Sequence, residues 1–248
     1  MHPILAAQLA DDFCCTVCDV ERREPVFSIL ERREGQRRYK PEGDLFKAAV
    51  VDGKLLIAGT PDMAAWCRAR YAHSNPAWFM EMSTLRELDA RLHEDGLCIA
   101  TAHPFFLPAR PVSPDASGYT VTWYEQADIE QFRGDPRFPE SYAFNALAPD
   151  VLGVSIAADG AIAAMAGASR DSARMWQIGV DVQPPMRGKG LGSLVVSLLR
   201  NEIERRGALP FYGTSMSHMV SQKTALRAGF SPAWTELYAQ RIPQKSSP

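Results

Sequence analysis

A glycine-rich turn between a strand and a long amphipathic helix is the feature that most constrains this chain. Residues 180–193 read VDVQPPMRGKGLGS, and the residues before them alternate like a strand. Glycines let a backbone approach a phosphate closely, and the free N–H groups and dipole of a first helical turn favour an anion. The segment therefore predicts an anion site to which Arg187 and Lys189 add positive charge. The helix after it has one continuous apolar face, formed by Leu191, Leu194, Val195, Leu198, Leu199 and Ile203.

The glycine spacing excludes the two commonest nucleotide-binding motifs. A P-loop requires a serine or threonine after its lysine, and Lys189 is followed by Gly190. A dinucleotide fingerprint has its third glycine three residues after the second, whereas here Gly192 follows after only two. The preceding strands, predicted at residues 151–156 and 161–166, form a hairpin rather than a βαβ unit, which also argues against a dinucleotide fold.

The segment resembles the signature of the GNAT superfamily of N-acetyltransferases, [QR]-x-x-G-x-[GA] at a strand-to-helix junction. Here Val182-Gln183-Pro184 leads into Arg187-x-x-Gly190-x-Gly192. The predicted order downstream also agrees: helix 191–206, strand 209–213 and helix 217–228, closed by Gly229-Phe230. The resemblance covers residues 118–248 and implies an α/β (α+β) fold, with a mixed, mostly antiparallel sheet flanked by helices.

The whole chain is similar, more loosely, to bacterial GNAT proteins that carry an extra N-terminal domain. The stretches 175–182 and 210–215 support this second resemblance. We therefore expect two domains: a smaller N-terminal α/β domain at 1–117 and the acetyltransferase domain at 118–248. Four prolines between residues 104 and 114 mark the boundary as linker-like.

The resemblance implies acetyl-CoA as co-substrate, with no metal. The backbone of Val180 and Val182 is expected to pair with the pantetheine arm, and the Val182 N–H to stabilise the oxyanion. The five cysteines all precede residue 118, so direct transfer to an amine, without a cysteine acyl-enzyme, is expected. The residues expected to hold the pyrophosphate are Arg187, Gly188, Lys189, Gly190, Leu191, Gly192 and Ser193.

The catalytic acid and base are less well defined by the sequence. Many relatives carry a tyrosine where this chain has Ala225, so the thiolate must be protonated in another way. Tyr212 and His218 are the leading candidates, and Ser215, Ser217 and Tyr238 lie nearby in the sequence. Asp181 is the acidic residue on the strand before the loop and the candidate base; a surface carboxylate is an equally good interpretation.

Three functions remain open at this level. The first is acetylation of an amine in a small molecule or peptide. The second is a catalytically degenerate module that binds or senses acyl-CoA, which the missing tyrosine favours. The third is transfer from another activated acyl donor on the same fold.

The N-terminal half contains further predicted elements: a hairpin at 47–59, helices at 61–71 (capped by Thr60) and 83–94 (capped by Ser83), and a strand at 98–102. We expect this half to form one wall of the acceptor site. The alternative is a separate domain that aids solubility or dimerisation, and a homodimer fits either case.

Composition and charge limit the partners and the cellular compartment that we expect for the protein. The net charge is −2 and the pI about 6.2, without the basic excess of a nucleic-acid-binding protein. The basic stretch at 32–40 is interpreted as a solvated face or hairpin, in preference to a nucleic-acid patch. No signal segment or membrane span is evident. Five cysteines, an odd number that includes one C-x-x-C without a second pair, predict free thiols in a cytoplasmic protein and no structural zinc.

Overall fold

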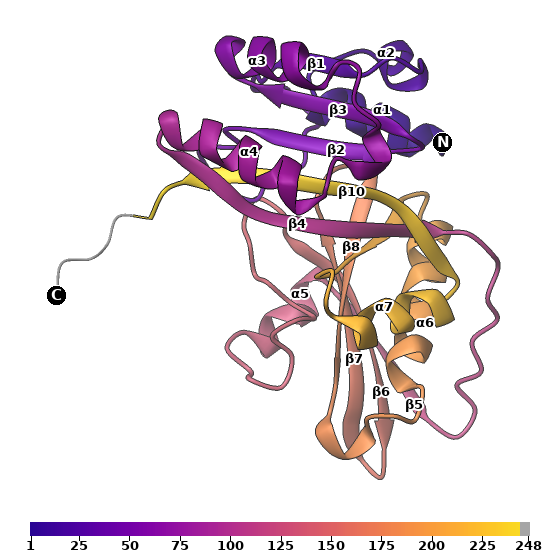
Figure 1. Ribbon diagram of the computed structural model, residues 1–248. Helices are drawn as coiled ribbons and strands as arrows, with labels where there is room; N and C mark the ends of the chain where they lie inside the picture. The colour runs from indigo at the N-terminus through magenta and orange to yellow at the C-terminus, as the bar shows by residue number, and fades with distance from the viewer. Residues whose placement is uncertain (244–248) are drawn as a thin grey trace, which may run out of the picture. The chain divides into compact units, whose positions relative to one another are not determined.

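A computed structural model describes residues 1–243 of the chain (Figure 1). Helices and strands are interspersed along the described chain, as a mixed α/β sequence pattern predicts. The elements are α1 (Pro3–Asp12), α2 (Val17–Glu21), β1 (Val26–Ile29), β2 (Lys47–Val51), β3 (Lys54–Gly59), α3 (Pro61–Tyr71), η1 (Pro76–Trp78), α4 (Met82–Glu94), β4 (Leu97–Pro108), β5 (Thr120–Glu125), α5 (Gln126–Ile129), η2 (Glu130–Phe132), β6 (Asp150–Ala158), β7 (Ala161–Arg170), β8 (Met175–Val182), η3 (Pro184–Met186), α6 (Leu191–Arg205), β9 (Leu209–Gly213), α7 (Met219–Arg227) and β10 (Phe230–Arg241).

These elements group into two compact units. The first comprises Met1–Gln36, Glu42–Pro104 and the residues from Ala233 on; the second comprises Arg37–Pro41 and Phe105–Pro232. Strands β4 and β10 contribute residues to both units. The boundary expected at residue 117 lies inside the second unit.

In the first unit the strand order is β1-β3-β2-β10-β4. The hairpin β2–β3 forms as predicted, and its turn residues Asp52 and Gly53 have φ angles of 47° and 72°, as a type I′ turn requires. Helix α3 also begins as predicted, because the Thr60 hydroxyl accepts a hydrogen bond from the N–H of Met63. The core of this unit is formed by side chains that include Phe46, Leu55, Ile57, Met63, Phe79, Leu88, Leu92 and Leu237.

Two sequence expectations for this unit are wrong in detail. Ser83 does not cap α4, because the helix begins a residue earlier and its first backbone bond runs from Leu85 to the carbonyl of Glu81. The strand expected to stop at residue 102 continues as β4 to Pro108. A proline can lie in a strand where its nitrogen is not needed as a ladder donor, so Pro104 did not end it.

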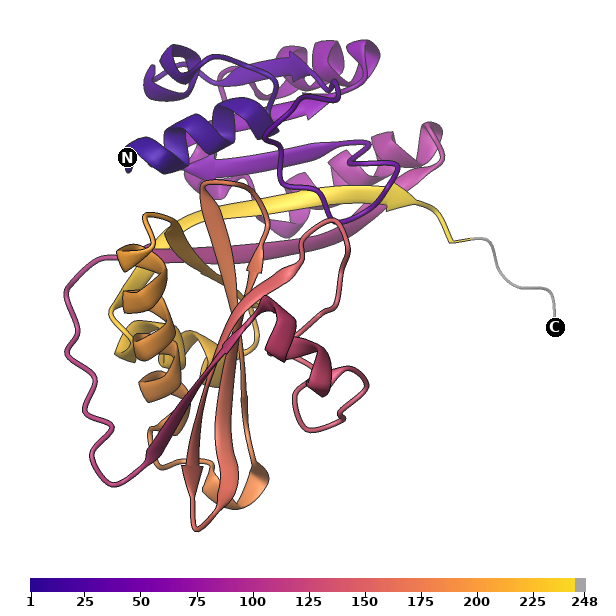
Figure 2. The same ribbon diagram turned by 180° about the vertical axis from the view of Figure 1, so that it is seen from behind.

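In the second unit the strand order is β4-β9-β8-β7-β6-β5. The described pairings in this sheet are antiparallel except β8 with β9, which is parallel. This is the mixed, mostly antiparallel sheet flanked by helices that the sequence predicted. One face is covered by α6, as Figures 1 and 2 show. The core between them contains Leu152, Val154, Ile156, Ala164, Ala166, Ala168, Ile178, Leu191, Val195, Leu199 and Ile203.

The opposite face of this sheet has a smaller, aromatic core. Helix α5 lies on that side (Figure 2), and the rings of Phe132 and Tyr142 stack with centroids 5.6 Å apart. Met165 of β7 belongs to this core, whereas its strand neighbours Ala164 and Ala166 face α6. The alternation of side chains along β7 thus supplies both cores at once.

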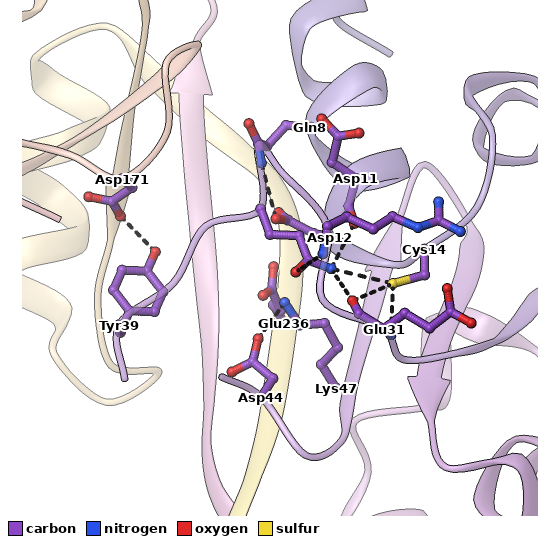
Figure 3. Close-up of polar contacts among 12 residues, drawn as sticks. Gln8, Asp11, Asp12, Cys14, Glu31, Tyr39, Asp44, Lys47, Asp171 and Glu236 are labelled. Atoms are coloured by element: carbon purple, nitrogen blue, oxygen red, sulfur yellow. Dashed lines mark hydrogen bonds and ion pairs between the residues drawn. The ribbon is translucent and has the colours of Figure 1, made fainter. Parts of the chain in front are cut away.

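A short segment of the N-terminal half, Arg37–Pro41, belongs to the second unit. The Tyr39 hydroxyl donates to Asp171 at 2.6 Å (Figure 3), and the Arg37 guanidinium lies over the ring of Phe211 at 5.7 Å. Arg37 is only 2% exposed, so the interpretation of residues 32–40 as a solvated face is wrong at this position. A planar guanidinium can be buried where it stacks on an aromatic ring.

The cysteines are free thiols in the structure, as predicted. The Cys14 thiol is buried, donates to the Glu31 carbonyl and accepts from the Glu31 N–H, both at 3.2 Å (Figure 3). Burial raises the pKa of Cys15 to about 11 and that of Cys67 to about 12. These thiols remain protonated at neutral pH and are poor nucleophiles or metal ligands.

Candidate functional site

The glycine-rich loop forms an exposed turn at the head of α6. Gly188 and Gly190 have φ angles of 79° and 82°, a conformation that favours glycine. Gly190 is the N-cap, and no side chain caps the helix. The first helical bond runs from Leu194 to the Gly190 carbonyl, so the N–H groups of Leu191, Gly192 and Ser193 have no acceptor within the helix. The turn therefore presents a row of donors to an anion.

The two cationic side chains of the loop lie beside this turn. The Arg187 guanidinium donates through Nε to the Val182 carbonyl at 3.1 Å, and Lys189 Nζ lies 3.5 Å from the Met186 sulfur. Both side chains are exposed. A phosphate bound at the helix terminus is thus within reach of positive charge as well as of backbone donors.

Strand β8 has an open edge directly before this loop. Its parallel pairing with β9 extends from Met175 only to Gln177, whereas its pairing with β7 continues to Val182. The end of β9 pairs instead with β4, at Tyr212 with Phe106. The second half of β8 therefore has a free edge among the described residues.

The hydrogen-bond parity of β8 determines which groups face that edge. The N–H of Gln183 donates to the carbonyl of Ala163 in β7. In an antiparallel ladder the bonded pairs alternate, so odd-numbered residues of β8 bond to β7 and even-numbered ones point away from it. The carbonyl of Arg174, which accepts from the N–H of Leu209 in β9, agrees with this parity. The main-chain groups of Val180 and Val182 thus face the open edge.

Three glycines lie side by side on neighbouring strands, facing the side of the sheet opposite α6. Gly153 of β6 pairs with Gly167 of β7, which pairs with Gly179 of β8. A Cβ atom on Gly179 would lie 1.9 Å from the carbonyl oxygen of Glu140, and one on Gly167 would lie 2.0 Å from that of Ser141. The backbone of residues 138–142, called the strap below, therefore rests directly on the strands.

Asp181 fastens the strap to β8. Its Oδ2 atom accepts hydrogen bonds from the N–H groups of Glu140 (3.0 Å) and Ser141 (2.8 Å) and from the Ser141 hydroxyl (2.9 Å). The side-chain amide of Gln183 also donates to the Arg137 carbonyl at 3.2 Å. The sequence analysis missed the strap. Glycines within three successive strands were the signal that a backbone passes close to the sheet.

Tyr212 points from β9 toward α7. It is 3% exposed, and its hydroxyl lies 2.8 Å from the Ser221 hydroxyl. Burial raises the pKa of Tyr212; the Ser221 hydrogen bond lowers it, and the negative charges of Glu140 and Asp181 raise it further. The net shift is upward, so the phenol keeps its proton at neutral pH and can donate it.

The remaining candidates lie around the start of α7. His218 is exposed and occupies the N-cap of that helix without a side-chain cap bond. Ser215 and Ser217 are also exposed, and their hydroxyls lie 3.2 Å apart. Ala225, at the position where many relatives have a tyrosine, is completely buried. Tyr238 belongs to the first unit.

Among residues 1–243 no three His, Cys, Asp or Glu side chains are grouped so that they could hold a metal ion. Each helix in the same range is too short or too polar to cross a bilayer.

The second unit is thus a mixed α/β domain: an antiparallel meander that ends in one parallel pair, with a glycine-rich turn at the head of the covering helix. Residues 119–230 match the sequence profile of the Acetyltransferase (GNAT) family. This part of the chain is a GNAT acetyltransferase domain.

Solved structures with a similar fold include several proteins of this family. A GCN5-related N-acetyltransferase-like protein from Streptococcus suis is 15% identical over 83% of this chain and 89% of its own, with a TM-score of 0.44. A GCN5-related N-acetyltransferase from Kribbella flavida is 20% identical over 64% of each chain, with a TM-score of 0.48. A Salmonella typhimurium protein solved with its cofactor acetyl-CoA is 15% identical over 53% of this chain and 98% of its own, with a TM-score of 0.35. A search of curated protein sequences found no significant match.

Proposed function

We propose that the protein is an acetyl-CoA-dependent N-acyltransferase that moves an acetyl group directly to the amine of a small molecule or peptide. The observation that carries this proposal is the open edge of β8 running straight into an uncapped, glycine-rich helix terminus. An extended acyl carrier could pair with the open strand edge, and a phosphate at its end could bind the N–H groups of the helix terminus. Membership of residues 119–230 in the acetyltransferase family supports the same reaction.

The residues present fit coenzyme A. The N–H groups of Gly188 to Ser193, with the side chains of Arg187 and Lys189, would hold the pyrophosphate. The main-chain groups of Val180 and Val182 would hold the pantetheine arm as a neighbouring strand does. Acetyl-CoA supplies the activated acetyl group as a thioester.

The chain's own side chains then handle the protons. The Val182 N–H would stabilise negative charge on the thioester carbonyl oxygen; the direction of this N–H toward the open edge of β8 supports that role. Tyr212 is the proton donor for the departing thiolate, since its phenol is protonated at neutral pH and bonded to Ser221. His218 is the alternative donor, although its exposure means that solvent competes with it.

Binding of acetyl-CoA tests this function directly. At 100 times its dissociation constant, acetyl-CoA should add about 2.7 kcal/mol to the free energy of unfolding, seen as a rise in melting temperature. Gly190→Asp should abolish the rise, because a carboxylate would then stand where the phosphate binds. Aspartate tolerates positive φ better than most residues, so this variant should still fold.

Gly160→Asp is the matched control. Gly160 has a φ of 80°, almost that of Gly190, and open space around it, but it lies in the β6–β7 turn. This variant should keep the full response to acetyl-CoA. An unchanged melting temperature of the wild type with saturating acetyl-CoA would refute the proposed function.

A second candidate function is a domain that binds acyl-CoA without turnover. The observation that favours it is Ala225, a buried alanine where many relatives have a tyrosine. A panel of amines, assayed by release of free coenzyme A thiol, separates the two. Binding of acetyl-CoA without acetylation of any amine identifies a sensor.

A further inference from the structure

The strap fixes the position of Glu140 beside the open edge of β8. The Glu140 carbonyl oxygen rests on Gly179, and its N–H donates to Asp181 two residues further along the strand. Ser141 is tied on both sides, to Asp181 and, through its hydroxyl, to the Met165 carbonyl at 3.1 Å. Gly179 and Asp181 belong to the half of β8 that does not pair with β9. The backbone of Glu140 is therefore held over the segment whose N–H groups would face the thioester.

The side chain of Glu140 has a different environment from that of Asp181. The Asp181 Oδ2 atom already accepts three hydrogen bonds, so its function is to hold the strap. The Glu140 side chain is exposed, and within residues 1–243 its carboxylate forms no ion pair. Both carboxylates nevertheless act on Tyr212, whose pKa they help to raise. Glu140 thus supplies a carboxylate that forms no ion pair among residues 1–243, on a strap held over the half of β8 that does not pair with β9.

We propose that Glu140 receives the acceptor's amino group as a primary ammonium ion and takes a proton from it, with Asp181 as the positioning residue. This rests on the proposed function and adds the substrate class: an amine that arrives positively charged. A carboxylate attracts such an amine and, once protonated, leaves it neutral and nucleophilic. A hydroxyl acceptor arrives uncharged, so it lacks the electrostatic attraction that a carboxylate offers to an ammonium ion.

An N–H bond of the ammonium breaks and its proton passes to the Glu140 carboxylate, directly or through one water. The nitrogen lone pair forms a bond to the carbonyl carbon, and the carbon–sulfur bond breaks with its electron pair on sulfur. Tyr212 protonates the thiolate and regains a proton from the amide nitrogen, while Glu140 returns its own to water. One ammonium and one thioester thus give one amide, one thiol and one proton.

The test compares Glu140→Gln with the wild type. Rates are measured with acetyl-CoA and three primary amines that are cationic at pH 7, namely spermidine, tyramine and lysyl-alanine. A lost general base lowers the rate by about 100-fold or more, so kcat/KM should fall by that factor for each amine the wild type uses. The deficit should shrink as the pH rises toward 10, because the amine then loses its proton in solution. With hydroxylamine, which is uncharged at neutral pH, the variant should match the wild type.

Glu130→Gln is the control, since Glu130 is an exposed glutamate paired with Arg133 before the strap. It should leave every rate unchanged. A pH-independent deficit in Glu140→Gln, or an equal loss with hydroxylamine, would show a merely structural role and overturn the proposal. So would a wild type that binds acetyl-CoA but acetylates none of the amines. Absence of acetyl-CoA binding is a separate result that refutes the proposed function itself.

Discussion

At the scale of single residues, two tyrosines of the second unit make the same bond in different places. Tyr212 bonds to Ser221 beside the open edge of β8, at 2.8 Å. Tyr124 bonds to Ser155 on the opposite face of the sheet, at 2.9 Å. The two tyrosine–serine hydrogen bonds are chemically equivalent, but only that of Tyr212 lies at the candidate site. Comparing substitutions of the two tyrosines therefore separates an effect on catalysis from an effect on stability.

Tyr212→Phe should lower kcat by about 100-fold if this phenol protonates the thiolate, with the affinity for acetyl-CoA unchanged. Tyr124→Phe should leave kcat as it is. Both should lose about 1 kcal/mol of stability with the hydrogen bond. Steady-state kinetics and urea unfolding check this. If Tyr212→Phe keeps its kcat while His218→Ala loses it, the proton donor is His218.

At the scale of elements, the strap depends on the three glycines beneath it. Their neighbours differ in kind: Gly179 and Gly167 lie against backbone oxygens, whereas a Cβ on Gly153 would meet the Tyr142 hydroxyl at 2.0 Å. A backbone held by Asp181 yields less easily than the end of a side chain. The order of destabilisation by alanine is therefore determined by what each Cβ would meet.

Gly179→Ala and Gly167→Ala should each lower the free energy of unfolding by about 1–3 kcal/mol, the range of overpacked sites. Gly153→Ala should cost less than either. Urea denaturation measures all three. A larger loss for Gly153→Ala would mean that the strap backbone moves more freely than its hydrogen bonds suggest.

At the scale of the whole molecule, the second unit begins before the proline-rich stretch. The β4 residues Phe105 and Phe106 pair with β9. Beyond them, the buried Arg200 guanidinium donates to the Arg110 carbonyl at 2.9 Å, and the Asn201 amide donates to the Val112 carbonyl at 3.0 Å. These bonds attach residues 105–112 to the acetyltransferase domain.

A fragment of residues 118–248 should therefore fold poorly. It lacks β4, loses the Arg110 carbonyl that accepts one hydrogen bond from the buried Arg200, and removes β2, the partner of β10. A fragment of residues 105–232 keeps the β4–β9 pairing and should melt at a higher temperature. Circular dichroism and the acetyl-CoA response compare them. Equal stability of the two fragments would support the boundary at residue 117.

The parts predicted correctly from sequence depend on short-range chemistry. The hairpin at Asp52 and Gly53, the cap at Thr60 and the apolar face of α6 follow from conformational preference and periodicity within a few residues. The anion turn at residues 187–193 could be identified for the same reason. Ser83 was misassigned because a capping preference is weak against the packing that sets where a helix begins.

The amino-acid sequence by itself determined the family, the mixed sheet and the loop expected to hold the donor, because glycine, proline and periodicity act locally. Only the tertiary structure decided which carboxylate is free and which is used. Asp181 is on β8 and Glu140 is 41 residues earlier, and nothing local links them. The contact between them depends on glycines in three neighbouring strands, which leave room for the backbone of the strap. Long-range pairing of this kind is set by the packing of the whole sheet, which no window of sequence contains.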